Sequence, residues 1–251
     1  MNTCYNPFSL EGKTILVTGA SSGIGRQTAI ECSKLGAQLI ISARNEARLQ
    51  ETLEALEGEG HISLTCEITD QEQLKQLVKQ LPELDGMVVC AGTATTLPIK
   101  FSDPGTMHNI FEINFFGNAE LVRLVYKSKK IKKGGSIVFL DSIGGVFKWA
   151  PGNGIYGSSK AALNSFMKFS ALEFAPRKVR VNCICPGMVD TPLIHRGTIS
   201  EEQMQENARQ YPLGRYGNPE DIAYAAVYLL SDATSWMTGQ SIVVDGGTSI
   251  K

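Results

Sequence analysis

Short apolar runs alternate with longer amphipathic segments along most of this chain. The apolar runs predict β-strands at residues 14–17, 38–43, 62–66, 87–90, 136–140, 179–184 and 242–244. The second run contains Leu39, Ile40 and Ile41 in succession, which is typical of a strand with both faces buried. Most runs are followed by glycine, proline or small polar residues, which gives those strands a defined end.

Helical periodicity follows these runs and predicts helices at residues 24–35, 45–56, 70–80, 106–129, 156–174, 200–210 and 218–230. Gly36 is suited to ending the first helix, Asp70 to capping the third, and Asn218 followed by Pro219 to starting the last. Strands that alternate with helices in this way predict a mostly parallel seven-stranded sheet, doubly wound, in the α/β class. No linker or repeat interrupts the pattern, so we expect residues 1–251 to form one domain after a loose arm at residues 1–10.

A glycine-rich turn joins the first predicted strand to the first predicted helix, in Thr18-Gly19-Ala20-Ser21-Ser22-Gly23-Ile24-Gly25-Arg26. Gly19 permits a tight turn, Gly23 lets a pyrophosphate approach the backbone, and Gly25 lets the helix pack closely on the strand. The helix N-terminus adds free N–H groups and partial positive charge. The spacing differs from G-x-G-x-x-G, and a turn without a ligand has similar composition. The strand–turn–helix context favours a phosphate cradle.

The end of the second predicted strand bears on which dinucleotide such a cradle would hold. A carboxylate there holds the ribose 2′-hydroxyl of NAD, whereas an arginine accommodates the 2′-phosphate of NADP. The strand ends in Ser42-Ala43-Arg44-Asn45, without an acidic residue. Because Arg44 can form a bidentate pair with a phosphate, we expect NADP(H) to be preferred, with NAD(H) as the second choice. The alternative is that Arg44 is a solvated charge at the start of the next helix.

Composition and charge narrow the function classes. The chain has 251 residues, 43% of them hydrophobic, and a formal net charge of −1. Near-neutral charge argues against nucleic-acid binding as the main role. No apolar run approaches the roughly 18 residues of a membrane helix, and no basic-then-apolar leader is present, so we expect no membrane association and a cytoplasmic location.

The cysteines and histidines do not predict a metal site. Six cysteines are scattered without a C-x-x-C motif, at Cys4, Cys32, Cys66, Cys90, Cys183 and Cys185. We expect them to be free buried thiols. Cys183 and Cys185 are expected to point to opposite faces of their strand and therefore not to share a metal ion. His61, His108 and His195 lack ligand spacing.

Ser142, Tyr156 and Lys160 are candidates for acid–base chemistry. Ser142 follows the fifth predicted strand, at the sheet edge where open α/β folds bind ligands. Tyr156 and Lys160 are four residues apart and share one helix face. A tyrosine with its ordinary pKa of about 10 is a poor acid or base near neutral pH, and a lysine cation one turn away lowers that pKa. Ser142 would then hold a substrate oxygen by a hydrogen bond.

Each of these three residues has an ordinary alternative explanation. Tyr-x-x-x-Lys pairs occur by chance on helix faces, and a serine at Ser142 can simply belong to a turn. A serine hydrolase is a poor fit, because Ser142 lacks the Gly-x-Ser-x-Gly elbow.

The whole chain resembles the classical short-chain dehydrogenase/reductases. The glycine-rich turn matches their cofactor turn, and Ser142, Tyr156 and Lys160 match their catalytic serine, tyrosine and lysine. Asn114 matches the asparagine that, in the family, completes a proton relay through water to the lysine. Residues 186–191 match the segment that contacts the nicotinamide, and residues 238–247 match the C-terminal strand. Residues 214–221 look most like the 3-oxoacyl-carrier-protein reductase branch.

This resemblance implies a single Rossmann domain that transfers hydride between a nicotinamide and a carbonyl or secondary alcohol. Tyr156 would exchange the proton on oxygen, and Lys160 would also bind the nicotinamide ribose. Family members form dimers or tetramers through the helices that carry Asn114 and Tyr156, so we expect a homo-oligomer. The cofactor-binding residues that the resemblance implies are Gly19, Ser21, Ser22, Gly23, Ile24, Gly25, Arg44, Glu67, Ile68, Ala91, Gly92, Tyr156, Lys160, Pro186, Gly187, Val189 and Thr191.

Two positions depart from the family pattern. Cys90 replaces the asparagine that follows the fourth strand, which affects local sheet contacts more than catalysis. Glu67 stands where the family has an aspartate that contacts adenine.

The substrate is less well defined by the sequence than the cofactor. Residues 191–217 are expected to form a lid. The expected substrate border is mostly apolar and comprises Ile143, Phe147, Trp149, Met188, Leu193 and Ile194. This apolar border favours a carbonyl substrate with a hydrophobic remainder, such as a 3-oxoacyl thioester. The alternative is that Phe147 and Trp149 pack at a subunit contact. A steroid, sugar or xenobiotic reductase is the nearest alternative. A non-catalytic dinucleotide-binding sensor, which needs only the cradle, is the other.

Overall fold

Seven parallel strands form one sheet in the order β3-β2-β1-β4-β5-β6-β7. The computed structural model describes residues 5–196 and 200–251. The strands are β1 (Thr14–Thr18), β2 (Gln38–Ala43), β3 (Ile62–Thr65), β4 (Leu84–Val89), β5 (Ile131–Leu140), β6 (Arg180–Pro186) and β7 (Ser241–Val244). The strand order reverses between β1 and β4, which is where open α/β sheets bind ligands. The predicted doubly wound α/β fold is confirmed.

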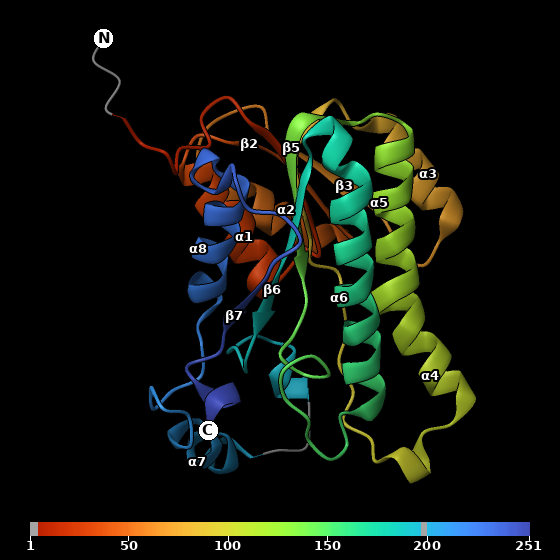
Figure 1. Cartoon of the computed structure of the whole chain (residues 1–251), viewed down its shortest axis with the longest axis vertical. Coiled ribbons are helices and arrows are strands. Elements are labelled where there is room, and N and C mark those ends of the chain that lie inside the picture. The colour runs from red at the N-terminus through yellow and green to blue at the C-terminus, as the bar shows by residue number, and fades with distance from the viewer. Residues whose placement is uncertain (1–4, 197–199) are drawn as a thin grey trace.

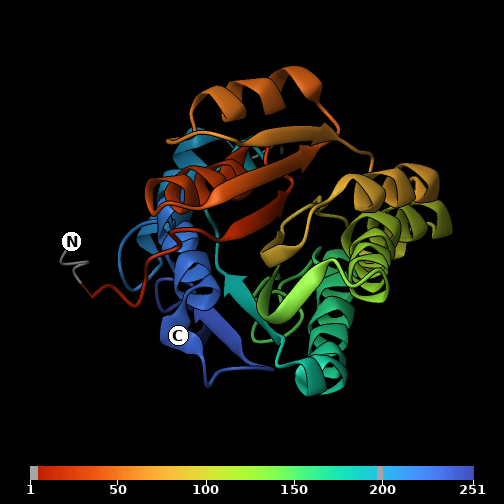
Figure 2. The ribbon, with the colours of Figure 1, turned by 90° about the horizontal axis from the view of Figure 1, so that it is seen from above.

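Helices cover both faces of the sheet (Figures 1 and 2). One face carries α1 (Gly23–Lys34), α2 (Glu46–Glu54) and α8 (Pro219–Leu230), and the other carries α3 (Gln71–Gln80), α5 (Gly117–Lys127) and α6 (Gly154–Phe174). Two further helices, α4 (Pro104–Phe111) and α7 (Glu201–Arg209), lie below the sheet in the view of Figure 1. Short 3₁₀ turns occupy Ile99–Phe101, Ala175–Arg177, Ile194–Arg196, Asp232–Thr234 and Thr248–Ile250.

The core consists of two apolar layers, one on each side of the sheet. Ile15 and Val17 of β1 point into the layer under α1 and α8, whereas Leu16 points into the layer under α5 and α6. Alternation of side chains along a strand produces this division. It explains why the strands are continuously apolar in sequence.

The helix predicted at residues 106–129 is interrupted. It starts earlier, at Pro104, where Asp103 accepts hydrogen bonds from two backbone amides of the first turn. A π-helical turn at Glu112–Phe116 separates α4 from α5, which ends at Lys127. β5 also begins earlier than predicted, at Ile131, which is buried. The sequence does not show this start, because two lysines and two glycines follow Ile131 and interrupt the apolar pattern.

The prediction that Cys183 and Cys185 point to opposite faces is wrong. Residues two apart on a strand share a face, and the two Sγ atoms lie 3.7 Å apart. Both thiols are buried, and together with a carboxylate oxygen of Asp141 they form a cluster with all three atoms within 4.8 Å of one another. The geometric reason for excluding a shared ion therefore does not hold.

Candidate active site

The glycine-rich turn after β1 leaves room for a ligand at the carboxyl edge of the sheet. Gly19 and Gly23 have φ angles of +65° and +54°, a backbone conformation that favours glycine. A Cβ on Gly25 would overlap the carbonyl oxygen of Gly19, and a Cβ on Gly23 would lie 3.2 Å from the side chain of Thr191. Ser21, Ser22 and Ile24 are half-buried in the same turn. The turn fits the pyrophosphate of a dinucleotide, which needs bare backbone N–H groups.

Arg44 and Glu67, two of the predicted cofactor-binding residues, lie next to each other. The parallel pairing of β2 with β3 places the ends of the two strands side by side, with Ala43 opposite Thr65. Arg44 Nη1 lies 3.5 Å from Glu67 Oε2, and the arginine side chain is 67% exposed. Asn45 caps α2 by accepting a hydrogen bond from the Arg48 amide. A phosphate at Arg44 would therefore compete with Glu67 for the guanidinium.

Ser142 and Tyr156 meet beside Gly144. The Ser142 Oγ accepts a hydrogen bond of 2.9 Å from the Gly144 amide. A Cβ on Gly144 would lie 3.3 Å from that Oγ and 3.7 Å from Cε1 of Tyr156, so both side chains border this glycine. Tyr156 is half-buried in the first turn of α6. The serine and the tyrosine therefore lie on either side of one glycine at the carboxyl edge of the sheet.

Lys160 lies one helical turn beyond Tyr156 and is 5% exposed. Its Nζ donates a 2.8 Å hydrogen bond to the carbonyl oxygen of Leu140, the last residue of β5. This bond ties the lysine to the strand that presents Ser142. A buried ammonium at this position can stabilise a nearby phenolate.

Asn114 is fully buried in the π-helical turn and is tied to two segments of the site. Its Oδ1 accepts a hydrogen bond from the Thr93 amide (2.8 Å), and its Nδ2 donates to the Thr93 carbonyl and to Ser159 Oγ (both 3.0 Å). Ser159 in turn donates to the Tyr156 carbonyl at 2.7 Å. The π turn therefore aligns Asn114 with the start of α6. Thr93 and Ser159 were not identified from the sequence.

Gly92 separates Asn114 from Lys160. A Cβ at this position would lie 3.3 Å from Asn114 Oδ1 and 3.7 Å from Lys160 Nζ. The amide and the ammonium thus face a common space that a larger residue would fill. This arrangement is compatible with the relay that the resemblance implies.

The Cys90 substitution is accommodated by backbone contacts. The amides of Cys90 and Ala91 both donate to the hydroxyl of Thr18, at 3.1 and 3.3 Å, and so join the ends of β4 and β1. Burial raises the pKa of the Cys90 thiol to about 12. The thiol is therefore uncharged at neutral pH, and it is not needed for this strand contact.

The segment after β6 forms one wall of the site. The Ile143 amide donates to the Pro186 carbonyl at 3.1 Å, and the Gly187 amide donates to the Val244 carbonyl at 3.1 Å. Val189 and Thr191 are buried, as is Ile68, whose carbonyl packs against Gly117. These contacts hold the predicted nicotinamide-binding segment against β5 and β7.

Most of the predicted substrate border lies near this wall, and its exposure varies. Ile143 is buried, whereas Trp149 is 76% exposed and Phe147 is 39% exposed. The predicted lid spans residues 191–217, of which 197–199 lie outside the described residues.

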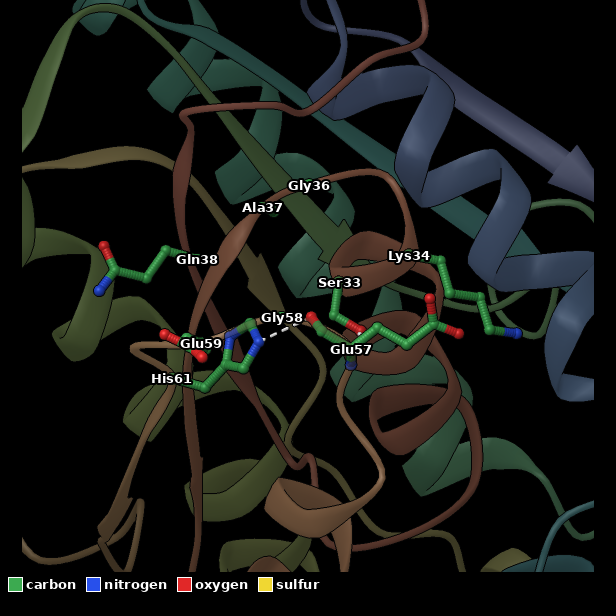
Figure 3. A pocket seen from close by; sticks show the side chains of 9 residues that line it. All are labelled: Ser33, Lys34, Gly36, Ala37, Gln38, Glu57, Gly58, Glu59 and His61. Carbon is green, nitrogen blue, oxygen red and sulfur yellow. Dashed lines mark hydrogen bonds between the residues drawn. The ribbon is translucent and has the colours of Figure 1, made fainter.

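A separate pocket of about 290 Å³ lies at the opposite, amino edge of the sheet (Figure 3). Residues at the end of α1, the start of β2 and the loop before β3 line it. The His61 Nδ1 accepts a hydrogen bond from the Leu39 amide (3.0 Å), and its Nε2 is 2.8 Å from the Glu57 carbonyl oxygen. Both ring nitrogens are thus occupied by backbone contacts, so this histidine has a structural role.

Comparisons with known proteins agree with this geometry. Residues 19–249 match the protein family described as enoyl-(acyl carrier protein) reductase. The chain is 37% identical over 239 residues to the 3-oxoacyl-[acyl-carrier-protein] reductase FabG of Rickettsia prowazekii, covering 95% of this chain and 97% of that protein. It is 34% identical over 250 residues to a tropinone reductase homolog of Arabidopsis thaliana, covering 97% and 92%.

Solved structures show the same relationship. A short-chain type dehydrogenase/reductase from Mycobacterium ulcerans superposes with a TM-score of 0.87 at 34% identity, covering 97% of this chain and 92% of that one. This chain belongs to the classical short-chain dehydrogenase/reductase family. Within the family it is FabG-like, and it is an oxidoreductase that acts on CH–OH or carbonyl groups with a nicotinamide dinucleotide. Among the described residues, no helix has the length and apolar character needed to span a bilayer.

Proposed function

We propose that this enzyme is an NADP(H)-dependent carbonyl reductase whose substrate is a 3-oxoacyl thioester. The observation that carries the proposal is the meeting of Ser142 and Tyr156 beside Gly144, with Lys160 one turn away on the same helix. The substrate class is supported by the named activity of the Rickettsia relatives, at 36–37% identity. A ketone on a ring system is the second candidate, supported by the tropinone reductase homolog and by a fungal trihydroxynaphthalene reductase at 32% identity.

In the proposed mechanism the protein handles the proton, and the bound dinucleotide supplies or accepts the hydride. The Ser142 hydroxyl donates a hydrogen bond to the substrate oxygen, on which negative charge develops. Tyr156 gives its phenolic proton to that oxygen during reduction and takes it back during oxidation. The Lys160 ammonium stabilises the phenolate left on Tyr156 and holds the ribose next to the nicotinamide. Asn114 positions the first turns of α6 through Ser159.

Cofactor choice is proposed to depend on Arg44. Its guanidinium is exposed, and its partner Glu67 is 3.5 Å away, so the arginine can turn to a 2′-phosphate. A charge-assisted bidentate contact with phosphate is stronger than an exposed ion pair. The remaining cofactor contacts are proposed for the glycine-rich turn, Ile68, Ala91, Gly92 and the wall formed by residues 186–191.

We further propose that residues 1–251 act as one domain, that residues 191–217 close over the substrate, and that copies of the chain associate into a homodimer or homotetramer. The Tyr211 hydroxyl accepts a 3.2 Å hydrogen bond from the Met188 amide, which links the proposed lid to the wall of the site. Five cysteines of the described chain are free, as is usual in the reducing cytoplasm, where we place the protein.

The first experiment measures the binding of NADPH and NADH to the purified protein, followed by NADPH oxidation with a panel of carbonyls that includes a 3-oxoacyl thioester. We expect tighter NADPH binding and turnover of the thioester. Tyr156→Phe should lower kcat by about 100-fold or more, because general acid catalysis contributes roughly that much, and it should leave NADPH binding unchanged. Tyr126→Phe, in a ring stack with Phe174 on the outer helices, is the matched control and should keep full activity.

Two results would contradict the proposal. Undiminished turnover in Tyr156→Phe would exclude the tyrosine as the proton donor. Tight cofactor binding without turnover of any carbonyl would favour a dinucleotide sensor.

A further inference from the structure

Behind the catalytic residues lies a cluster of five polar side chains, four of them buried. Asp141 follows β5 and is 4% exposed, and its Oδ2 accepts a 2.7 Å hydrogen bond from Asn164 of α6. The thiols of Cys183 and Cys185 lie 3.9 and 3.8 Å from the same oxygen. The Ser241 hydroxyl lies 3.0 Å from the Asn164 amide. The other oxygen of Asp141, Oδ1, has no hydrogen-bond partner among the described residues.

This arrangement is costly to the folded state. A buried carboxylate with one unpaired oxygen loses hydration that the protein does not replace. Burial accordingly raises the pKa of Asp141 to about 6, although the nearby Lys160 charge and the Asn164 hydrogen bond favour the ionised form. Groups retained at a cost to stability are concentrated at functional sites.

Lys160 is the charged group that faces Asp141. Lys160 and Asn164 are four residues apart on α6 and share the face that packs on β5 and β6. Asn164 contacts the carboxylate, and Lys160 Nζ is bonded to the carbonyl of Leu140, the residue before Asp141. The remaining groups around the carboxyl are uncharged: the thiols of Cys183 and Cys185 from β6, the amide of Asn164 and the backbone N–H of Ser142.

We propose that Asp141 is a positioning residue whose buried carboxylate balances the charge of Lys160 and thereby sets the acidity of Tyr156. Tyr156, Lys160 and Asn164 follow one another at four-residue intervals along α6, so the lysine lies between the tyrosine and the contact with Asp141. The lysine cation lowers the pKa of Tyr156, and the carboxylate behind it opposes that effect. The catalytic tyrosine is therefore tuned by a pair of charges. This inference rests on the proposed role of Tyr156.

The direct test is nuclear magnetic resonance of the full-length protein with ¹³Cζ-labelled tyrosine, which follows ionisation without any substrate. The Tyr156 signal is assigned by its loss in Tyr156→Phe. In Asp141→Asn we expect the pKa of Tyr156 to fall by about half a unit or more, because the negative charge on the far side of Lys160 is removed. Glu31→Gln is the matched control: Glu31 is a buried carboxylate of α1 paired with Lys34 at 2.9 Å, and its loss should leave Tyr156 unmoved.

An activity measurement separates this inference from the proposed function. Where the enzyme turns over a carbonyl, the alkaline limb of its kcat/KM profile should move to lower pH in Asp141→Asn. The size of this move should equal the fall in the pKa of Tyr156 measured by the resonance. If the pKa of Tyr156 falls in Asp141→Asn and no carbonyl is reduced, the proposed function fails and the charge coupling stands. If turnover is found and the pKa of Tyr156 is the same in both proteins, the coupling is refuted.

Thermal unfolding gives a second, independent readout. The folded state raises the pKa of Asp141, so the native protein binds this proton more tightly than the unfolded chain, and its stability falls as pH rises through about 6. The melting temperature of Asp141→Asn relative to the parent should therefore be higher at pH 8 than at pH 5. If Asp141→Asn and the parent differ in melting temperature by the same amount at both pH values, the carboxyl is not a buried charge. That result would overturn the inference.

Metal analysis of the purified protein provides a further challenge. A stoichiometric zinc ion that is lost in Cys185→Ala would make Asp141 a metal ligand, with its charge committed to the ion. That result would also overturn the inference. The inference is supported if the purified protein contains no metal and the pKa of Asp141 is the same before and after treatment with a chelator.

Discussion

At the scale of single residues, the pair formed by Arg44 and Glu67 carries the clearest consequence for function. The pair is exposed and long, at 3.5 Å, and such pairs contribute about 0–1 kcal/mol. A phosphate ester bound in bidentate geometry offers the arginine a stronger partner. The ion pair therefore keeps Arg44 at the ends of β2 and β3 without preventing it from binding a ligand.

We predict that Arg44→Asp moves cofactor preference from NADPH towards NADH. The substitution removes the proposed phosphate contact and places a carboxylate where NAD-binding folds hold the 2′-hydroxyl. Hydrogen bonds to charged groups contribute about 1.5–3 kcal/mol, so NADPH affinity should fall by about tenfold or more. Titration calorimetry with both cofactors measures the change.

Glu67→Gln is the companion variant for Arg44→Asp. It frees Arg44 and removes a negative charge, and it should bind NADPH at least as tightly as the parent. An unchanged ratio of NADPH to NADH affinity in Arg44→Asp would show that this arginine does not contact the phosphate.

At the scale of single residues, the sequence predicts site residues where chemistry and spacing coincide. Ser142, Tyr156 and Lys160 were identifiable because a strand end and a four-residue helical interval place them at one edge of the sheet. The contact of Asp141 with Cys183 and Cys185 was not, because it depends on which face of β6 the thiols occupy and on its neighbour β5. The partners of Asn114 were missed for the same reason.

At the scale of secondary-structure elements, the glycine-rich turn and the π-helical turn determine the shape of the site. The first is visible in the sequence, because glycine at Gly19, Gly23 and Gly25 has few substitutes in a turn of this geometry. The second is not, because nothing in residues 112–116 distinguishes a π turn from an α-helix. The bonds of buried Asn114 to Thr93 and Ser159 accompany it. Single π turns are frequent at functional sites.

We predict that Gly25→Ala lowers both stability and NADPH affinity. The new Cβ would overlap the Gly19 carbonyl, and overpacking of this kind costs about 1–3 kcal/mol. Thermal unfolding with and without NADPH should show a lower melting temperature and a smaller shift on cofactor addition.

Gly154→Ala is the control for Gly25→Ala. It also adds a methyl group at the start of a helix, but that Cβ meets only the side chain of exposed Ile99, at 3.2 Å. Equal effects of the two substitutions would argue against a specific role for the close approach at Gly25.

At the scale of the whole molecule, apolar side chains gather on the outer side of α6 and the π turn. Phe169 and Leu172 of α6 are 63% and 74% exposed, and Phe116 of the π turn is 48% exposed. Phe115 links the two regions through ring contacts with Phe116 and Phe166. Exposed apolar patches of this kind mark interaction surfaces. These are the helices through which we expect two copies of the chain to associate.

Light scattering should therefore give a mass that is a multiple of the 27.2 kDa chain. The double variant Phe169→Glu, Leu172→Glu should lower that mass, because two carboxylates would be buried at the contact. Tyr224→Glu, at an exposed position on α8, is the control and should keep the parent mass. A monomer at working concentration in the unmodified protein would exclude the proposed assembly.

By itself, the sequence determined the class of fold and the glycine-rich turn, and it predicted Ser142, Tyr156, Lys160 and Arg44 as site residues. These features depend on periodicity, glycine geometry and spacing within one element, which are local properties. Only the tertiary structure decided that Arg44 is paired with Glu67, that Asn114 lies in a π turn, and that Asp141 lies with two thiols behind Lys160. Those contacts join residues 21 to 45 positions apart. Strand order and register bring them together, and neither can be obtained from local pattern alone.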